Sequence, residues 1–379
     1  MTTMTKIGGF GIVLLAWLLM VLPIAGMAAE VSGLYEAEVQ VFSQKRSERA
    51  TAMAAALAEV VVKVSGRRDA AELKGVAQSI RRPARFLQQY RYSALSAEQR
   101  EQALQEAALN NVSRADPQIV LFHFDKAAVD KVLRDNGLPV WGATRPATLA
   151  WLAVQDEGKR YLLAADSPEP VRELLAREAQ RRGLALLLPL MDLQDQQALP
   201  FADVWGNFRE PIMQASLRYR TESVLVGRMY RAVSGEWQAQ WTLLEGGQTQ
   251  SWAAAGTLPV EVIDEGVSGA IRVLASRYAP VAGEQADLLP VTIIDVRTLR
   301  DYARVTRYLK SLQQVEHVQV AQVDADQVTF ELDVEGGPEA IAQTIALGHV
   351  LQRYQPPMTA NGELISWTKR NTQTYQLLP

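Results

Sequence analysis

Cysteine is absent from this chain of 379 residues, and histidine occurs only three times. The absence of cysteine excludes disulfide bonds, thiolate metal sites, thiol catalysis and a lipoprotein anchor. The three histidines, His123, His317 and His349, include no closely spaced pair of the kind that holds zinc. We therefore expect no metal, no cofactor, and a fold whose stability comes from hydrophobic cores.

A large excess of either charge is also absent, because the formal net charge is -3 at pH 7. A protein that binds nucleic acid normally shows a basic surface, so nucleic acid is not an expected partner. Hydrophobic residues make up 48% and charged residues 21% of the chain, which indicates neither disorder nor a polytopic membrane protein. The length indicates about two or three domains.

The motifs of common enzyme classes are missing. No glycine-rich phosphate-binding motif and no G-x-S-x-G elbow follows an expected strand, which disfavours nucleotide-binding enzymes and serine hydrolases. A glycosidase is harder to exclude, because its two carboxylates can come from anywhere in the sequence. Asp192 and Asp203, in a polar loop over 191–208, are the candidates for such a pair or, with Asp195, for metal ligands. Loop carboxylates are common, so we expect no catalytic residue and no enzymatic activity.

The amino terminus has the composition of an export signal. Lys6 precedes an uncharged run over 7–29, which ends in small residues that include Ala28 and Ala29. We expect residues 1–29 to be a signal peptide, cleaved after Ala28 or Ala29, and the protein to be periplasmic. The alternative is an uncleaved segment that tethers the protein to the inner membrane, facing the periplasm.

Residues 30–137 are expected to form a small α+β domain. A loosely alternating pattern predicts a strand within 31–41, and apolar residues at helical spacing predict a helix from the N-cap Ser47 to Gly66. The other expected elements are helices over 75–89, interrupted near Pro83, and 96–109, a strand over 117–124 and a helix over 125–136.

This domain also holds the most basic part of the chain. Its arginines are Arg67, Arg68, Arg81, Arg82, Arg85 and Arg91. They could form a patch that faces an anion or peptidoglycan. Acidic residues occur in the same region, among them Asp69 and Glu72, and they favour a solvated face of mixed charge.

Residues 138–280 are expected to form a central α/β domain that begins with a hinge over 138–146. An apolar strand, a helix that begins at Pro168 after its cap Ser167, and a second apolar strand predict a right-handed βαβ unit with a parallel pair. Gly227, within a later expected strand, indicates that another part of the protein packs closely against the backbone there. The expected elements are strands over 148–155, 184–190 and 223–230, helices over 168–182, 209–218 and 260–278, and a hairpin over 236–256.

Residues 289–379 are expected to form a carboxy-terminal α+β domain in the order βαββα, with one more strand near 364–368. The fold class is therefore a multidomain combination of α/β and α+β. A central mixed sheet is flanked by a small strand-plus-helices domain and by the βαββα domain.

Several motifs resemble a known family. The stretches over 138–154 (LPVWGATRPATLAWLAV), 61–66, 223–229 and 345–349 resemble exported bacterial proteins grouped as domain of unknown function 2066 (DUF2066), over nearly the whole chain after the leader. The central order of elements is similar to the amino-terminal domain of TolB and to lipoprotein activators of penicillin-binding proteins, and the opening strand and helix to flagellar assembly protein T. The resemblance implies an envelope assembly or adaptor role, without established catalytic residues.

The expected function is that of a periplasmic interaction or adaptor protein, whose partner is an envelope protein. The candidate interaction residues are tryptophans and arginines, because these supply most binding hot spots: Trp141, Arg145, Trp151, Trp205 and Arg209. The competing interpretation is that these tryptophans pack the seam between domains. A function of another class is also open, in which the loop over 191–208 binds a small ligand or a glycan.

Overall fold

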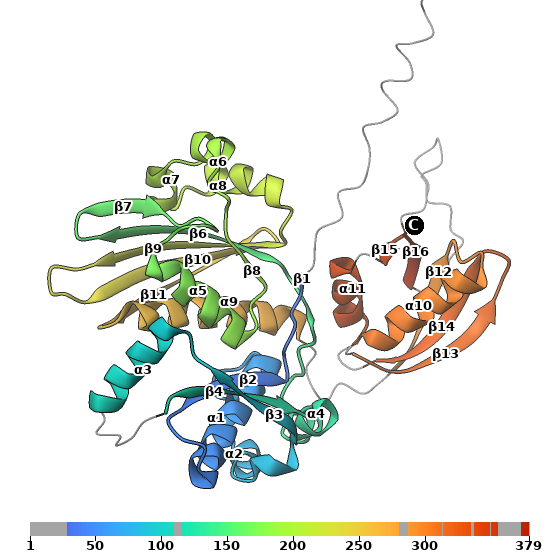
Figure 1. Ribbon diagram of the computed structural model, residues 1–379. Helices are drawn as coiled ribbons and strands as arrows, with labels where there is room; N and C mark the ends of the chain where they lie inside the picture. Colours follow the sequence, from blue (N-terminus) through green and yellow to red (C-terminus); the bar gives the residue numbers. More distant parts are fainter. Residues whose placement is uncertain are drawn as a thin grey trace, which may run out of the picture.

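A computed structural model describes residues 29–109, 116–279, 287–312, 314–334, 337–348, 350–354 and 373–378. Almost all of the expected signal peptide and the whole strand expected at 364–368 lie outside these ranges. The fold is mixed α/β, with three larger sheets (Figure 1). Each of these sheets has its own hydrophobic core. We call the parts that hold these sheets the amino-terminal unit (29–140), the central unit (141–279) and the carboxy-terminal unit (287–378).

The amino-terminal unit is an antiparallel sheet covered by a long helix. The sheet has the order β2-β4-β3, formed by β2 (Glu36–Val41), β3 (Leu87–Ala94) and β4 (Gln118–Phe124). Helix α1 (Arg46–Ser65) buries a stripe of alanine, leucine and valine against it and ends at Gly66, whose φ is 67°. The smaller elements are α2 (Lys74–Ile80), the 3-10 helix η2 (Pro83–Arg85), α3 (Ala97–Leu109) and α4 (Lys126–Asp135).

Two expectations for this unit are wrong. The helix over 75–89 ends at Ile80, and the chain then forms η2 and strand β3, because Pro83 cannot continue an α-helix and the tyrosines that follow pair with β4. The N-cap of α1 is Lys45 rather than Ser47. The strand over 117–124 and the helices over 96–109 and 125–136 are confirmed within a few residues.

The central unit is a mixed sheet of order β11-β10-β9-β6-β7, in which β8 also pairs with β6. Strand β6 (Thr148–Asp156) lies beside β9 (Ser223–Arg231), to which it is parallel. The remaining strands are β7 (Lys159–Leu162), β8 (Leu186–Leu187), β10 (Trp237–Glu245) and β11 (Gln248–Gly256).

The apolar run of β6 is explained by burial on both faces. Its even-numbered side chains pack against helices α5 (Pro170–Arg182) and α9 (Pro259–Tyr278). Its odd-numbered side chains pack under α7 (Phe201–Trp205) and α8 (Arg209–Ser216) on the other face. A strand covered on both sides has no polar face, so its sequence shows no alternation.

The structure confirms the parallel pairing of β6 with β8 after α5, the hairpin over 236–256 and the helix over 260–278. A Cβ added at Gly227 would lie 2.5 Å from the Trp241 ring, which confirms the close approach. Helix α5 begins at Pro170 after Glu169, two residues later than expected, and β8 is only two residues long. The largest error concerns residues 191–208. We expected a loop there, and the structure has two short helices, α6 (Leu193–Ala198) and α7.

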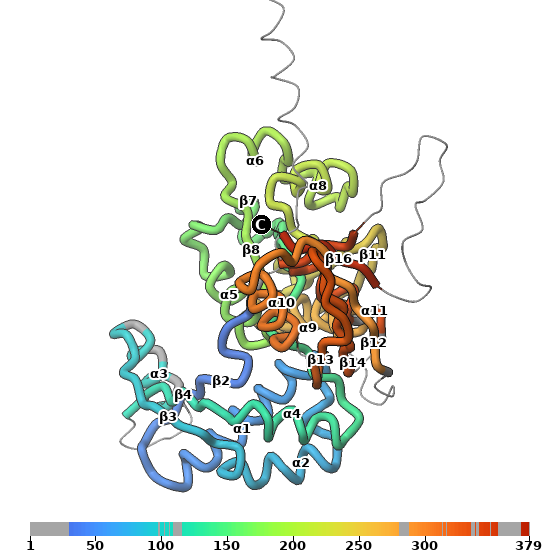
Figure 2. The backbone as a smooth tube through the Cα atoms, turned by 90° about the vertical axis from the view of Figure 1, so that its right-hand side faces the viewer, coloured from blue at the N-terminus to red at the C-terminus, as the bar shows by residue number. Residues whose placement is uncertain are grey.

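The carboxy-terminal unit confirms the expected βαββα order. Its sheet has the order β13-β14-β12-β16-β15, with β12 parallel to β16. Figure 2 shows the unit from the side that is on the right in Figure 1. Its elements are β12 (Asp287–Ile294), α10 (Leu299–Ser311), β13 (Val315–Val323), β14 (Gln327–Val334), α11 (Gly337–Leu347), β15 (Leu351–Arg353) and β16 (Gln373–Leu377).

Two short strands join distant parts of the chain. Strand β1 (Ala29–Glu30) pairs with β5 (Thr144–Arg145), which lies in the hinge between the amino-terminal and central units. Within the described ranges, no helix is both long enough and apolar enough to cross a membrane.

Candidate functional site

Arg145 lies at the seam between the amino-terminal and central units, with 1% of its surface exposed. Its Nε donates to the carbonyl of Gly142 at 3.0 Å, and its Nη1 to the carbonyl of Gly183 at 2.7 Å. Its Nη2 donates to the carbonyls of Lys63 at 2.8 Å and Trp141 at 3.0 Å. The guanidinium group therefore joins α1, α5 and the hinge through backbone acceptors alone.

The acceptors explain how this cation is stabilised without a carboxylate. Lys63 is in the last turn of α1, and Gly183 is the C-cap of α5. The carbonyls at a helix carboxyl end have no partner within the helix and carry a partial negative charge. Burial lowers the pKa of Arg145 to about 9, so the side chain is still cationic at neutral pH.

Trp141 packs beside Arg145 and is 2% exposed. The guanidinium carbon lies 4.1 Å from the centre of its ring. The Trp141 backbone N–H donates to Val64 of α1, whereas its side chain belongs to the core of the central unit. Its neighbour Val140 belongs to the core of the amino-terminal unit. This burial supports the seam interpretation of Trp141 and Arg145, since a partner could not reach either side chain.

Ion pairs cross the same seam. Arg181 of α5 lies 3.1 Å from Glu59 of α1. Arg68, which follows α1, lies 2.6 Å from Glu265 and 3.3 Å from Asp264 of α9. The seam therefore combines a buried cation, an aromatic ring and surface ion pairs.

Trp151 is fully buried under the helices on the other face of the central sheet. Its Nε1 donates to the Ser216 hydroxyl at 2.9 Å, and its ring lies edge-on to Tyr219 at 6.1 Å. Trp151 therefore holds the end of α8 against β6. We call residues 191–219, from Met191 through α6, α7 and α8, the helical cap.

Two carboxylates of the helical cap, those of Asp192 and Asp195, are bound by other residues of the cap. Arg218 donates to both Asp192 and Asp195 at 2.8 Å. Asp195 is fully buried and also accepts from the Tyr219 hydroxyl at 2.5 Å. Arg218 and a backbone amide hold the pKa of Asp192 well below its usual range, while burial and Asp195 raise the pKa of Tyr219 to about 12.

The structure does not favour Asp192 and Asp203 as a reacting pair, because Arg218 already binds the Asp192 carboxylate. Asp192 is the N-cap of α6 and is bound by Arg218, whereas Asp203 is in the first turn of α7. No group of three or more histidine, aspartate or glutamate side chains that could hold a metal ion occurs in the part of the chain that the structure describes.

Trp205 and Arg209 lie at the junction of α7 and α8. Trp205 is half-buried, with its ring 5.4 Å from Phe201 and 6.0 Å from Tyr230. Arg209 is exposed and donates to the carbonyl of Gly247 at 3.0 Å. Of the five candidates from the sequence, these two are the accessible ones, and Arg209 is the more exposed.

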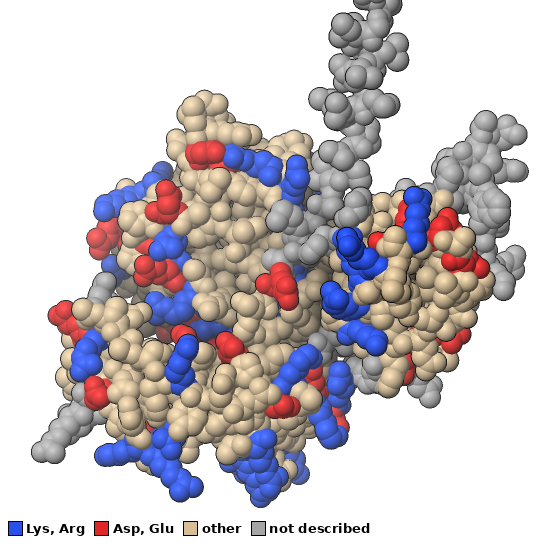
Figure 3. All heavy atoms as spheres, turned by 45° about the vertical axis from the view of Figure 1, so that its right-hand side comes forward, with Lys and Arg blue, Asp and Glu red and all other residues tan. Residues whose placement is uncertain are grey.

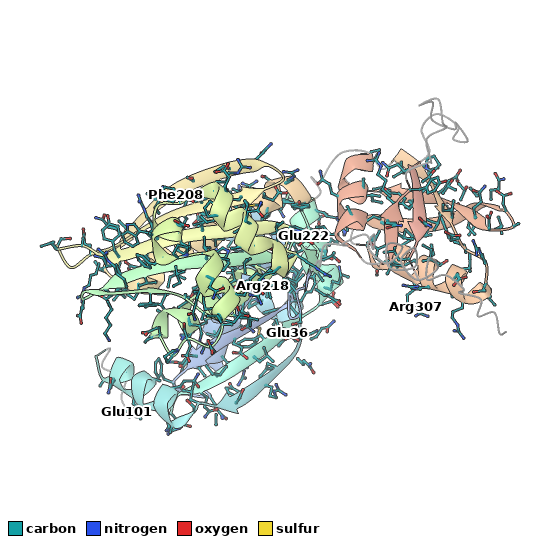
Figure 4. All side chains as sticks on the ribbon, turned by 90° about the horizontal axis from the view of Figure 1, so that it is seen from above. Glu36, Glu101, Phe208, Arg218, Glu222 and Arg307 are labelled. Atoms are coloured by element: carbon teal, nitrogen blue, oxygen red, sulfur yellow. The ribbon has the colours of Figure 1, made fainter. Side chains whose placement is uncertain are left out.

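Exposed hydrophobic side chains gather on the helical cap, and sequence reasoning missed them. Leu193 is 70% and Leu217 is 65% exposed, and Phe208 at the start of α8 is 55% exposed. We define the cap patch as the exposed residues around the Asp192–Arg218 ion pair, which are Leu190, Leu193, Met213 and Leu217. Figure 4 labels Phe208 and Arg218, which lie on either side of α8 in the sequence.

The members of the cap patch lie on elements that contact one another, since α6 packs against α8. Leu193 follows Asp192 and Leu217 precedes Arg218, so both leucines are next in sequence to a residue of the ion pair. The backbone N–H of Leu190 donates to the Tyr219 hydroxyl at 2.8 Å. Met213 lies one helical turn before Leu217. In the sequence, Leu190 ends an apolar run that reads as a strand, which concealed its exposure.

A small apolar crevice lies within the amino-terminal unit, and Ser79 is the only residue lining it that carries a polar side chain. Its walls are Leu57, Val61, Val76, Ser79, Ile80, Phe86, Val129 and Val132. Its lining holds no charged group, so the crevice supplies no candidate site residue to the proposals below.

Comparisons with known proteins give a family match for the first part of the chain. Residues 28–142 match the family described as Domain of unknown function (DUF8605). This finding corrects the resemblance to DUF2066, which is a different domain of unknown function, so what that resemblance implies is withdrawn. The match ends beside Trp141 and covers under a third of the chain.

Solved structures and curated proteins add little to that match. One solved chain, titled "Crystal structure of uncharacterized protein", is 13% identical, with 34% of this chain and 90% of that chain covered. Its TM-score of 0.16 is too low to support an argument about fold. No curated protein matches the chain.

Proposed function

We propose that this protein is a non-catalytic interaction protein of the cell envelope, which binds a protein partner through its helical cap. The observation that carries the proposal is the cap patch, where four large hydrophobic side chains are exposed around one ion pair. Exposed apolar side chains in a group are typical of protein interaction sites, whereas single ones are ordinary.

The rigidity of the helical cap supports this function. Trp151 fixes α8 to the sheet, and the buried Asp195 fixes α6 to Arg218 and Tyr219. A rigid surface loses little conformational entropy on binding, so more of the contact free energy appears as affinity. Arginine is a residue type that supplies hot spots near the centre of an interface, and Arg218 belongs to the ion pair around which the cap patch is defined.

The envelope location is part of the proposal and rests on the sequence alone. The uncharged run over 7–29 after Lys6 is the feature that favours export, with cleavage or with retention as a tether. The absence of cysteine is compatible with an oxidising compartment, because no free thiol is exposed there.

The experiment is cross-linked affinity capture of the tagged full chain from intact envelopes. The test variant replaces two leucines of the cap patch, Leu193→Ser and Leu217→Ser. The matched control replaces two apolar residues elsewhere that are more exposed than these leucines, Val233→Ser and Leu299→Ser, which are 108% and 82% exposed.

We expect one stoichiometric protein partner with the unchanged chain and with the control, and at least tenfold less of it with the cap variant. The purified partner must also bind the unchanged chain and the control with similar affinity, and the cap variant more weakly. Equal capture by the cap variant, or no stoichiometric partner for the unchanged chain, contradicts the proposal. Unaltered melting temperatures of both variants exclude unfolding as the cause.

A further inference from the structure

The segment from residue 73 to residue 95 carries five basic side chains and no acidic one, namely Lys74, Arg81, Arg82, Arg85 and Arg91. The formal net charge of the whole chain is -3, so the rest of the chain carries -8. A positive segment in a negative protein is therefore a local feature, which the overall composition conceals. We call these five residues the basic face.

All five side chains are exposed. None of them forms a salt bridge with a described residue, in contrast to the two arginines that precede the segment. Arg67 is paired with Asp69, and Arg68 is paired with α9. The face of mixed charge that we expected from the sequence therefore exists at 67–69, and the basic face lies beyond it.

The local fold holds the three central arginines on a rigid support. Arg81 is the C-cap of α2, Arg82 is the N-cap of η2, and Arg85 is the last residue of η2. Val76 is fully buried and Phe86 is 9% exposed, so the backbone on both sides of these arginines is anchored in the core. The neighbouring carboxylate of Asp125 already accepts from Ala128 and Gln88.

The basic face lies at one end of the molecule. Helix α2 is at the lower end in Figures 1 and 2, and the helical cap is at the upper end in both. Figure 3 shows Lys and Arg side chains gathered along the lower end, with few acidic side chains among them. A planar anionic surface could therefore meet the basic face without touching the helical cap.

We propose that the basic face docks the protein on an anionic lipid bilayer. The cations are spread over α2, η2 and β3 instead of converging on one point, which suits a layer of headgroups better than a single anion. Arginine binds phosphate through paired N–H groups and remains charged at all physiological pH values. Each basic residue near an anionic bilayer strengthens binding about fivefold.

The test is co-sedimentation of the full chain with vesicles. The vesicles are phosphatidylcholine alone, or phosphatidylcholine with about one third phosphatidylglycerol, at low and at high salt. The test variant is Arg81→Gln, Arg82→Gln, Arg85→Gln. The matched control, Arg160→Gln, Arg177→Gln, Arg231→Gln, removes the same charge from exposed positions of the central unit.

We expect the unchanged chain and the control to bind the anionic vesicles and to be released by high salt. The test variant should bind about 100-fold more weakly. Equal binding by the test variant overturns the proposal, and so does equal binding to vesicles without phosphatidylglycerol. Tighter binding to duplex DNA than to the anionic vesicles also overturns it and assigns the basic face to another polyanion.

Discussion

Arg145 is a cation that the protein buries with four carbonyl oxygens and no carboxylate. A buried charge is normally costly, and its cost is offset here by acceptors that already lacked partners at the ends of two helices. The same contacts place α1 and α5 relative to each other. The residue is therefore both a cap for two helices and the centre of the seam.

Replacing Arg145 by methionine should lower the free energy of unfolding by about 3–5 kcal/mol, because several buried carbonyls lose their donor. Chemical denaturation of the full chain measures this loss. The control Arg209→Met removes an exposed arginine with one backbone contact and should change stability by less than about 0.5 kcal/mol. Equal effects of the two substitutions would contradict the role given to Arg145.

Trp141→Ala should also destabilise the protein, by about 3–5 kcal/mol, because it leaves a cavity in the core of the central unit. The measurement is the unfolding midpoint in denaturant. If the midpoint is unchanged while partner capture is lost, the seam interpretation of Trp141 is wrong and the residue belongs to a binding surface.

Acid should weaken the helical cap through Asp192. Its pKa in the folded protein lies below that in the unfolded chain, so its contribution to stability is complete above about pH 4 and is lost as the pH falls through the folded pKa. Melting temperatures between about pH 2 and pH 6 should show this loss, and Asp192→Asn should reduce it. An identical pH profile in the variant would show that the Arg218 contact does not stabilise the fold.

The sequence singled out Trp141 and Arg145 by residue type, but it could not predict which groups they contact. Trp141 and Arg145 stand out in the hinge because of their type, but the acceptors of Arg145 at Lys63 and Gly183 come from distant parts of the chain. Only the tertiary fold brings the ends of α1 and α5 together. For the same reason, nothing local in the sequence indicated that Arg218 would bind Asp192.

At the scale of elements, the close packing of α1 against α9 depends on one residue without a side chain. A Cβ added at Gly66 would lie 2.5 Å from the Cβ of Ala275 and 3.2 Å from the Trp141 ring. Gly66 also has a positive φ of 67°, which L-residues rarely adopt. The end of α1 is therefore constrained by both its backbone conformation and its neighbours.

Two glycine substitutions separate these constraints. Gly137 has nearly the same φ, 68°, and no atom within 4 Å of an added Cβ. Gly137→Ala should therefore lower the free energy of unfolding by about 1 kcal/mol, and Gly66→Ala by about 2–4 kcal/mol. Thermal or denaturant unfolding measures both. A smaller loss for Gly66→Ala than for Gly137→Ala would mean that α1 does not pack closely on α9.

Elements with a clear periodic pattern of apolar residues, or with glycine or proline at their ends, could be predicted from the sequence. Short elements could not. Helix α9 and the β10–β11 hairpin match the expected ranges, because each combines a clear apolar pattern with glycine or proline at its ends. Helices α6 and α7 have six and five residues and are separated by Pro200, which leaves no room for a helical repeat. Strand β3 could not be predicted from its own residues, because its tyrosines are recognisable as strand residues only once they pair with β4.

At the scale of the whole molecule, the two proposed binding surfaces lie at opposite ends, with the seam between them (Figure 1). The cap patch belongs to the central unit and the basic face to the amino-terminal unit. Contacts by Arg145, Arg181 and Arg68 join these units. A partner on the helical cap and a bilayer on the basic face would therefore be held at a fixed separation.

Calorimetry should show two unfolding transitions. The amino-terminal and central units should unfold together because Arg145 joins their helices, whereas the carboxy-terminal unit has a core that consists of its own residues. Arg145→Met should lower the midpoint for the joined amino-terminal and central units by about 10 °C and leave that of the carboxy-terminal unit unchanged. A shift of both midpoints would show that all three units unfold as one.

The pairing of β1 with β5 sets an order of events for a chain that is made from its amino terminus. Strand β1 cannot pair with β5 until residue 145 has left the ribosome. The last carbonyl that accepts from Arg145 is that of Gly183, which is synthesised later still. A nascent or truncated chain that stops between these points has the arginine but not its complete set of carbonyls. The seam between the two units is therefore completed only after the central unit has been synthesised as far as Gly183.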